Sequence, residues 1–428
     1  MEERQEFQCT QKTLDITLLC KVVDNFGDIG VVYRLARSLT DLSNQKIEGE
    51  SLPLVGTSLP PTPSSGDTPQ RPDAPSKTKI NLRIIIDNLE SFHLLCPEIN
   101  LEKEEQTSNG WQIYQWNAYQ TCLNAFRKNP PHIIIECFQC GRPDWLEELL
   151  FTEKVSNIVN IIMLDYLTAE DYAESFHKLQ SLTRSARVQK VNFMPGFTAK
   201  TGGLILDKPF LKALTERNTT NTKNESTKSF NAIFFSYPRD WTPAVKAFKR
   251  FNREYCKGSL NINLAKGAGY ESFLSAYKNA AENSPKDFFK LTELPFIPQT
   301  EWDALLTRTP LLFIRGEDSL SRACLCGVPF VWHAYPQTEE YQLVKVQALL
   351  DRMRQHFTPE LFKHVEKCWQ VYNTKNASSE ELESSIYNFL NNYASLCQGF
   401  ADFSNSLLKN GDLAEHILKF IDERNMLN

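Results

Sequence analysis

Short apolar runs alternate with amphipathic segments along most of the chain. Runs of four or more apolar residues predict buried strands, and residues 30–42 show the apolar spacing that is typical of a helix. An alternation of strands and helices indicates an α/β fold with a mostly parallel sheet. In the first half we predict strands at residues 16–23, 80–87, 131–138, 159–167 and 190–197.

The same alternation starts again after a polar stretch in the middle of the chain. Residues 215–229, TERNTTNTKNESTKS, contain no large apolar side chain, and a strand is predicted directly after them at 230–237. Two α/β halves joined by a linker have a cleft between them, and such folds bind ligands at the carboxyl ends of their strands. The tail is predicted to be helical, with a capping-box spacing from Ser378 to Glu381.

A segment rich in Pro, Ser, Thr and Gly interrupts the first half at residues 43–79. Such a composition cannot bury enough apolar surface to offset the entropy lost on ordering, so we predict a disordered insertion in the first domain. We therefore divide the chain into a first domain, a polar linker, a second domain and a closing helix, at residues 1–205, 206–229, 230–405 and 406–428.

Composition narrows the class of protein. The 428 residues are enough for two domains, and a net charge of -5 argues against a general nucleic-acid binder. Eleven scattered cysteines, an odd number, do not form the pattern of a disulfide framework and favour a reduced interior. The start has no apolar signal core, and no run of about 18 apolar residues occurs. We expect a cytoplasmic protein that binds neither nucleic acid nor membranes.

The stretch VVDNFGDIGVVYRLARSL, residues 22–39, carries two acids between a predicted strand and a predicted helix. It lacks the third glycine of a dinucleotide loop, and the carboxylates of Asp24 and Asp28 would repel a phosphate. A metal would need a third ligand, and none is evident. One of the two carboxylates could accept a proton or hold a cationic substrate. Alternatively, both acids are solvated and Asp28 caps the helix.

The motif FIRGEDSLSRACLCG in the second half joins another strand to a helix. The helix is predicted to begin near Asp318 or Ser319, since both residue types are good N-caps. Amides at a helix start suit a pyrophosphate, and Arg315 could add a fixed cation. Glu317 would then contact sugar hydroxyls or orient the loop. The alternative is a capped helix with a solvated acidic turn.

Other side chains are predicted near the same edge of the second domain. The ring of Phe296 and the amide of Gln299 could stack on and hydrogen-bond a flat pyrimidine, although a packed phenylalanine in a polar turn has the same pattern. Tyr335 lies on the loop after the next predicted strand. Cys137 and Cys140 form a C-x-x-C without a second pair of zinc spacing, so we predict buried thiols and no metal site.

Several motifs, in one order, resemble the elongation factor P arginine rhamnosyltransferase family. They are CKVVDNFGDIGVVYRLARSL, MPGFTAKTGGLI, LPFIPQTEWDALL and FIRGEDSLSRACLCGVPFVWHAYPQ, between about residues 16 and 350. The resemblance implies a GT-B architecture, in which two Rossmann-like domains face each other across a cleft, with a helical C-terminal tail that can cross back. It further implies an inverting transfer of rhamnose from dTDP-β-L-rhamnose to an arginine of elongation factor P, without a metal or cofactor.

The resemblance also implies roles for the residues of these motifs. It places Phe296 against thymine and Gln299 on the edge of the base, within the second domain. It makes Asp28 the general base and Asp24 its support, with Glu317 as a further catalytic carboxylate. The remaining donor-binding residues that it implies are Phe235 and Tyr237 at the nucleotide, and Arg315, Asp318, Ser319 and Tyr335 at or near the diphosphate and sugar.

Two other functions remain open from the sequence. One is a GT-B enzyme with a small-molecule or lipid acceptor, which the lack of a basic amphipathic helix makes less attractive. The other is a nucleotide-sugar binding protein without catalysis. Acids on the acceptor side argue against this second alternative, because binding alone would not require them.

Overall fold

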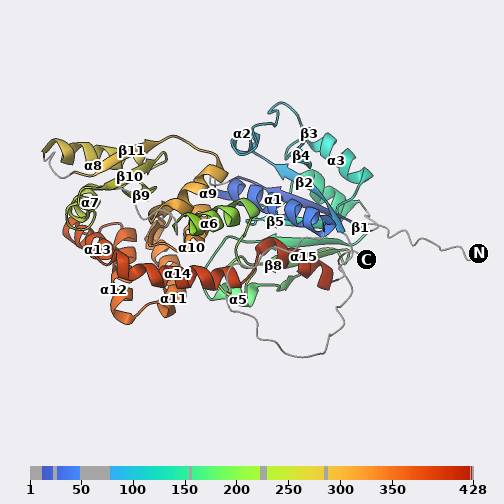
Figure 1. Ribbon diagram of the computed structural model, residues 1–428. Coiled ribbons are helices and arrows are strands. Elements are labelled where there is room, and N and C mark those ends of the chain that lie inside the picture. Colours follow the sequence, from blue (N-terminus) through green and yellow to red (C-terminus); the bar gives the residue numbers. More distant parts are fainter. Residues whose placement is uncertain are drawn as a thin grey trace, which may run out of the picture.

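The computed structural model describes residues 12–22, 27–48, 78–153, 157–221, 229–283, 288–424 and 426. Within these ranges the chain forms two lobes, each built on its own mostly parallel sheet (Figure 1). Asp24 and most of the Pro-rich insertion lie outside the described residues.

The first sheet has eight strands in the order β3-β4-β2-β1-β5-β6-β8-β7. All neighbours pair in parallel except the short edge strands β3 and β7, which are antiparallel. Counting only the parallel strands along the chain, this is the order 3-2-1-4-5-6 of a Rossmann fold. The strands are β1 (Lys12–Cys20), β2 (Thr78–Ile86), β3 (Glu105–Ser108), β4 (Trp111–Gln115), β5 (Ile133–Cys137), β6 (Val159–Leu164), β7 (Gln180–Ser181) and β8 (Val188–Phe193).

The second sheet has five parallel strands in the order β11-β10-β9-β12-β13. This is the order 3-2-1-4-5, so the second lobe is Rossmann-like as well. Parallel strands are covered by helices on both faces, which is why they read as continuous apolar runs in the sequence. The strands are β9 (Phe230–Phe234), β10 (Leu260–Ala265), β11 (Lys290–Leu294), β12 (Leu311–Arg315) and β13 (Phe330–His333).

Helices connect the strands and cover both sheets (Figure 1). Those of the first lobe are α1 (Gly27–Glu48), α2 (Leu89–His93), α3 (Tyr119–Lys128), α4 (Asp144–Glu147) with the π-turn η1 (Glu148–Thr152), and α5 (Tyr172–Phe176). Those that follow are α6 (Lys208–Asn221), α7 (Thr242–Glu254), α8 (Tyr270–Asn283), α9 (Gln299–Arg308), α10 (Glu317–Cys326), η2 (Thr338–Glu340), α11 (Gln342–Met353), η3 (Arg354–His356), α12 (Pro359–Asn373), α13 (Ser379–Asn391), α14 (Tyr393–Lys409) and α15 (Leu413–Glu423).

The last helix packs on the first lobe. Figure 1 shows the red helices α14 and α15 running from the second lobe toward β8 of the first. Leu413, Ile417 and Ile421 of α15 are buried in the same apolar cluster as the side chains of β1. The amide of Leu413 donates to the carbonyl of Leu204 at 2.9 Å, so this helix ties the end of the chain to the first domain.

Two predictions about loops differ from the structure. The range 206–229 was expected to be a polar linker, but α6 occupies residues 208–221, and Phe210 is fully buried in the core of the second lobe. An amphipathic helix explains this, because its few apolar residues all serve one contact. Residues 43–48 of the expected insertion belong to α1, and β2 starts at Thr78. Among the described residues, no helix combines the length and hydropathy needed to cross a membrane.

Candidate active site

Three of the predicted site residues lie near the two points where the strand order reverses. In the first sheet this point is between β1 and β5, and in the second it is between β9 and β12. Connections leave these strands toward opposite faces and open a crevice at their carboxyl ends. Asp28 follows β1, Phe235 follows β9 and Arg315 ends β12.

Asp28 is a buried carboxylate in the first turn of α1. Its exposed fraction is 3%, and the helix begins one residue earlier, at Gly27. The alternative of a solvated acid that caps the helix is therefore wrong. A helix N-terminus favours a negative charge, which supports an ionised carboxylate at this position.

Gly30 lets α1 approach the second lobe closely. A Cβ atom at this residue would lie 3.2 Å from Nε2 of Gln299 and 3.5 Å from Oδ2 of Asp318. Nε2 of Gln299 donates to the Gly30 carbonyl at 3.1 Å, across the boundary between the lobes. The second glycine of the FGDIG motif thus serves the packing of two domains.

Glu317 is the first residue of α10, which therefore begins one or two positions earlier than the sequence predicted. The N-cap is Gly316, not Asp318 or Ser319, and its φ of +76° is a backbone conformation that glycine adopts without a steric penalty. No side chain caps this end of the helix. The amides of the first turn therefore retain the donor capacity that suits an anion.

Glu317 reaches toward the first lobe. Burial raises the pKa of this carboxyl to about 7, against the opposing effect of Lys345. The carboxylates of Asp28 and Asp165 raise this pKa further, and a hydrogen bond from the amide of Leu167 lowers it. These contacts place a carboxyl that titrates near neutral pH beside Asp28, although the two belong to different domains.

Tyr166 joins this group, and we did not predict it from the sequence. It lies on the loop after β6, and burial, followed by the charges of Asp28 and Glu317, raises the pKa of its hydroxyl. The same interactions include a side-chain hydrogen bond to Asp28. In the sequence, the only indication that Tyr166 belongs to the site was its position two residues after a strand that ends there.

In the second lobe, the side chain of Arg315 packs against two aromatic rings. Its guanidinium lies 4.5 Å from the ring centroid of Phe235 and 4.8 Å from that of Tyr237. Its Nε is buried without a hydrogen-bond partner, and none of the ion pairs within the described ranges involves it. This arrangement keeps a cation at the strand end that is not neutralised by any carboxylate in the described part of the chain.

His333 has a structural role at this edge. Its Nδ1 accepts a hydrogen bond from the backbone amide of Tyr237 at 3.1 Å. Burial, reinforced by Arg239 and Arg315, lowers the pKa of His333 to about 3, so the ring is neutral and accepts at this nitrogen. Tyr335 is 64% exposed and packs edge-to-face on Tyr237 at 5.5 Å.

The remaining predicted donor residues differ in exposure. Phe296 is 56% exposed on the loop before α9, as a stacking platform requires. Ser319 is buried, and its Oγ accepts from Nε1 of Trp302 at 3.3 Å. Nε2 of Gln299 donates to Asp318 at 3.2 Å as well as to Gly30, so only the carbonyl of its side-chain amide remains without a partner.

Asp318 belongs to an ionic network between the lobes that the sequence did not reveal. Arg34 of α1 is fully buried, and its guanidinium binds Asp318 with two hydrogen bonds of 2.7 and 3.1 Å. It also binds both carboxylate oxygens of Asp303. Burial alone would raise the pKa of Asp318, but Arg34 outweighs it and lowers this pKa.

Three more charged residues complete this network. Asp207 pairs with Arg37 and, at 3.1 Å, with Arg322, and it lies 3.7 Å from Arg34. Arg322 also donates to the carbonyl of Ile205. In the sequence, the only indication of this network was that Arg34 and Arg322 each lie among apolar positions of a predicted helix. We refer to Arg34, Arg37, Asp207, Asp303, Asp318 and Arg322 as the interdomain ionic network.

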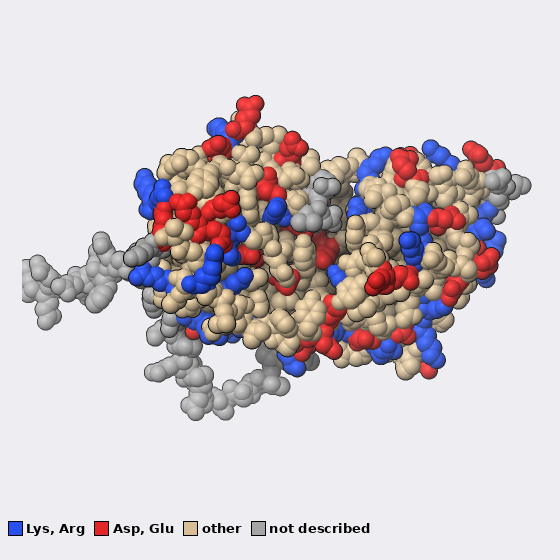
Figure 2. All heavy atoms as spheres, turned by 180° about the vertical axis from the view of Figure 1, so that it is seen from behind, with Lys and Arg blue, Asp and Glu red and all other residues tan. Residues whose placement is uncertain are grey.

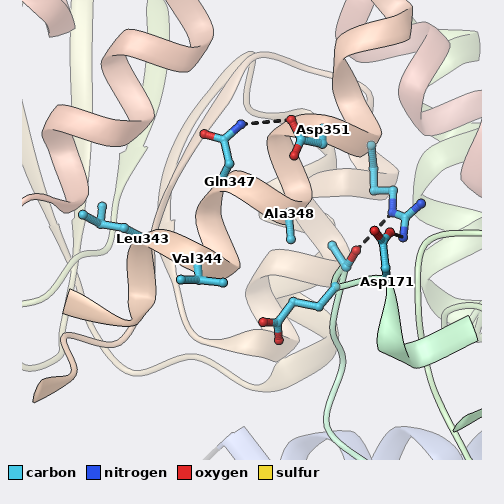
Figure 3. Close-up of a pocket in the computed structure, with 9 residues that line it drawn as sticks. Asp171, Leu343, Val344, Gln347, Ala348 and Asp351 are labelled. Carbon is cyan, nitrogen blue, oxygen red and sulfur yellow. Dashed lines mark hydrogen bonds and ion pairs between the residues drawn. The ribbon is translucent and has the colours of Figure 1, made fainter. Parts of the chain in front are cut away.

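A cavity of about 620 Å³ opens between the lobes at a different place (Figure 3). One wall is the segment from Ala169 to Asp171, and the other is α11. Arg352 of α11 crosses to the carbonyl of Ala169 at 3.0 Å and to Asp171 at 2.7 Å. None of the predicted site residues lines this cavity.

Acidic side chains gather where the two lobes meet, on the face shown in Figure 2. Within the described part of the chain, no group of three or more histidine, cysteine, aspartate or glutamate side chains is arranged to hold a metal ion. Cys137 is buried and Cys140 is partly buried, and burial raises the pKa of both thiols.

Comparison with known proteins identifies the family. The model of the family described as Elongation-Factor P (EF-P) rhamnosyltransferase EarP matches residues 16–48 and 74–422. The chain belongs to this family. Membership of the EarP family confirms the prediction of a glycosyltransferase.

Relatives of the chain carry a consistent name. Proteins named protein-arginine rhamnosyltransferase from Shewanella oneidensis and Neisseria meningitidis are each 28% identical to it, over 80% of this chain and 82% and 80% of their own. One from Pseudomonas aeruginosa is 25% identical, over 83% of this chain and 86% of its own.

Solved structures confirm the predicted architecture. A structure from work on EarP-mediated arginine glycosylation of translation elongation factor EF-P aligns with a TM-score of 0.51 at 16% identity, over 96% of this chain and 99% of that one. A UDP-GlcNAc 2-epimerase from Neisseria meningitidis aligns with a TM-score of 0.53 at 9% identity, over 96% of this chain and 100% of that one. The EarP-family chain therefore has the GT-B fold, with two Rossmann-like domains and C-terminal helices.

Proposed function

We propose that the protein transfers L-rhamnose from dTDP-β-L-rhamnose to an arginine side chain of elongation factor P, with inversion at the anomeric carbon. The observation that carries the proposal is a buried carboxylate, Asp28, at one switch point and, at the other, a cation, Arg315, that forms no ion pair with a carboxylate of the described residues. Family membership and the names of the relatives support the same reaction. We place the reaction in the cytoplasm, where the modified factor acts in translation.

The acceptor side must activate a guanidinium, which is protonated at neutral pH and a poor nucleophile. A carboxylate can hold this group by hydrogen bonds and align one nitrogen with the anomeric carbon. As the nitrogen–carbon bond forms, the bond from the anomeric carbon to the diphosphate oxygen breaks, and Asp28 takes the proton from the nitrogen. Attack on the face opposite the leaving group inverts the anomeric centre through an oxocarbenium-like transition state.

The donor side must stabilise the leaving dTDP, which receives the electron pair of the broken bond. Arg315 and the amides of the first turn of α10 supply positive charge for the diphosphate, so the reaction needs neither a metal nor a cofactor. Glu317 stands between the two halves of the reaction, with a pKa of about 7. In this proposal it contacts the rhamnose hydroxyls, and Tyr335 and Tyr237 border the sugar and nucleotide.

Phe296 provides a test of the donor site. We expect Phe296→Ala to weaken dTDP binding by about tenfold, because stacking of a base on an aromatic ring contributes about 1–3 kcal/mol. Isothermal titration calorimetry measures this directly. Phe176→Ala is the matched control, since Phe176 is similarly exposed, at 47%, on the first domain. Equal dTDP affinity of Phe296→Ala and wild type would exclude the stacking role.

Intact-mass spectrometry tests the reaction itself. Elongation factor P incubated with the protein and dTDP-β-L-rhamnose should gain the mass of one deoxyhexose, and a factor whose acceptor arginine is replaced by lysine should gain none. If the donor is consumed while the factor keeps its mass, the acceptor is a small molecule or a lipid. If the donor binds but is not consumed, the protein is a nucleotide-sugar binding protein without catalysis.

A further inference from the structure

The loop after β5 has a strained backbone next to the proposed base. Phe138 and Gln139 have φ angles of +57° and +53°, a left-handed conformation that is uncommon for residues other than glycine. Each such residue costs about 1–3 kcal/mol and persists only where its surroundings enforce it. Two left-handed residues in succession, at the switch point of the first sheet, indicate that the conformation of this loop serves a specific function.

Contacts with the loop after β6 hold this strained pair in place. The ring of Phe138 stacks on Tyr166 with a centroid distance of 4.7 Å and an interplanar angle of 25°. The side-chain amide of Gln139 donates to Oδ2 of Asp165 at 3.1 Å. The other oxygen of Asp165 accepts from the amide of Tyr166 at 2.8 Å, and the amide of Phe138 donates to Leu164 at 2.7 Å. Both strained residues therefore act on the position of Tyr166.

Tyr166 in turn contacts Asp28. Their side chains share a hydrogen bond, and a phenolic hydroxyl beside a carboxylate is the donor. The left-handed backbone directs the ring of Phe138 onto Tyr166, which limits the rotation of the tyrosine about its side-chain bonds. The strained backbone thus holds the hydroxyl of Tyr166 at a fixed position beside the proposed base.

We propose that Tyr166 is a positioning residue for Asp28, and that the strained pair Phe138–Gln139 fixes the tyrosine ring. The proposal rests on the proposed function, in which Asp28 is the base. The hydroxyl donates to the carboxylate and thereby fixes its orientation relative to the acceptor nitrogen. A donor to a carboxylate also favours its ionised form, so Asp28 remains a competent base at lower pH.

Other titratable groups face Asp28 from three elements. They are Cys20 of β1, Cys137 of β5 and Glu317 of α10. Burial raises the pKa of both thiols, so neither changes charge near neutral pH. Glu317, with a pKa of about 7, does change charge there, and a pH experiment must separate its effect from that of Asp28.

The test is the pH dependence of kcat for Tyr166→Phe in the full chain. We expect kcat at neutral pH to fall about tenfold, since hydrogen bonds to charged groups contribute more than neutral ones. The acidic limb of the profile should move up by about one pH unit, because the carboxylate loses a donor that favours its charge. The donor KM and the melting temperature should stay unchanged. Tyr114→Phe is the matched control, because that hydroxyl donates to Glu105 at 3.0 Å in the first sheet.

A lower kcat with an unmoved acidic limb would show a merely structural role and overturn the proposal, as would an unchanged kcat. Tyr166→Phe is also compared with the unchanged tyrosine in a Glu317→Gln background, by single-turnover kinetics, and the acidic limb must move there as well. If that shift disappears, the tyrosine acts through Glu317 and the proposal is wrong. Phe138→Leu should move the limb in the same direction, which keeps the test available if Tyr166→Phe does not fold. Failure of the proposed function looks different, since wild-type protein would then leave elongation factor P unmodified.

Discussion

Asp28→Asn should fold, bind the donor and lose most of its turnover. Asparagine has nearly the same shape as aspartate, so the first turn of α1 and its packing against the second lobe are preserved. It cannot accept the proton of a reacting guanidinium, and a positioned general base contributes about 10²–10⁴ to a rate. We therefore expect kcat for rhamnosyl transfer to fall by at least about 10².

Two measurements make this prediction specific. Calorimetry with dTDP should give the wild-type affinity, because the proposed donor-binding residues belong to the other lobe. Asp144→Asn is a suitable control, as Asp144 lies in the first turn of α4 on the surface of the same domain and should leave the rate unchanged. A kcat of Asp28→Asn within about threefold of wild type would remove Asp28 from the role of base.

The sequence allowed much of the architecture to be predicted for a physical reason. Strands covered on both faces are apolar throughout, so five of the six parallel strands of the first sheet and three strands of the second could be located. The chemistry was also readable, since Asp28 and Glu317 lie in the connections that follow such strands and Arg315 ends one, and parallel strands bring their carboxyl ends together. The structure brings Glu317 within electrostatic range of Asp28, and Arg315 lies two positions before Glu317 at the end of β12, while the roles of all three remain predictions.

What the sequence did not reveal depends on contacts between distant residues. Arg34 meets Asp303 and Asp318, which follow it by 269 and 284 positions, and no local pattern encodes such a pairing. Because this network was not foreseen, Asp318 and Gln299 were assigned to the donor alone, whereas both bind α1 in the structure. The edge strands β3 and β7 were missed since they are short and half exposed, and β4, β10 and β11 were not predicted either.

Arg34→Met should be the most destabilising of these substitutions. Arg34 is fully buried and neutralises two carboxylates of the second lobe, so its removal leaves the buried Asp303 and the partly buried Asp318 without their main cation. Burial already raises the pKa of Asp303 against the effect of Arg34. Breaking a buried ion pair by removing one partner costs about 3–5 kcal/mol. We expect a clear fall in the denaturant midpoint and in the melting temperature.

A double variant distinguishes the loss of ion pairs from a loss of side-chain packing as the cause of the destabilisation. Arg34→Met combined with Asp303→Leu removes both a cation and a buried anion, and should recover part of the lost stability, since an apolar pair of similar volume can replace a buried ion pair. Arg127→Met is the surface control, because Arg127 pairs with Glu148 and Glu153 in water, where ion pairs contribute little. If Arg34→Met were no less stable than Arg127→Met, the interdomain ionic network would not hold the two lobes together, and other contacts, such as those of Arg352 and α15, would have to do so.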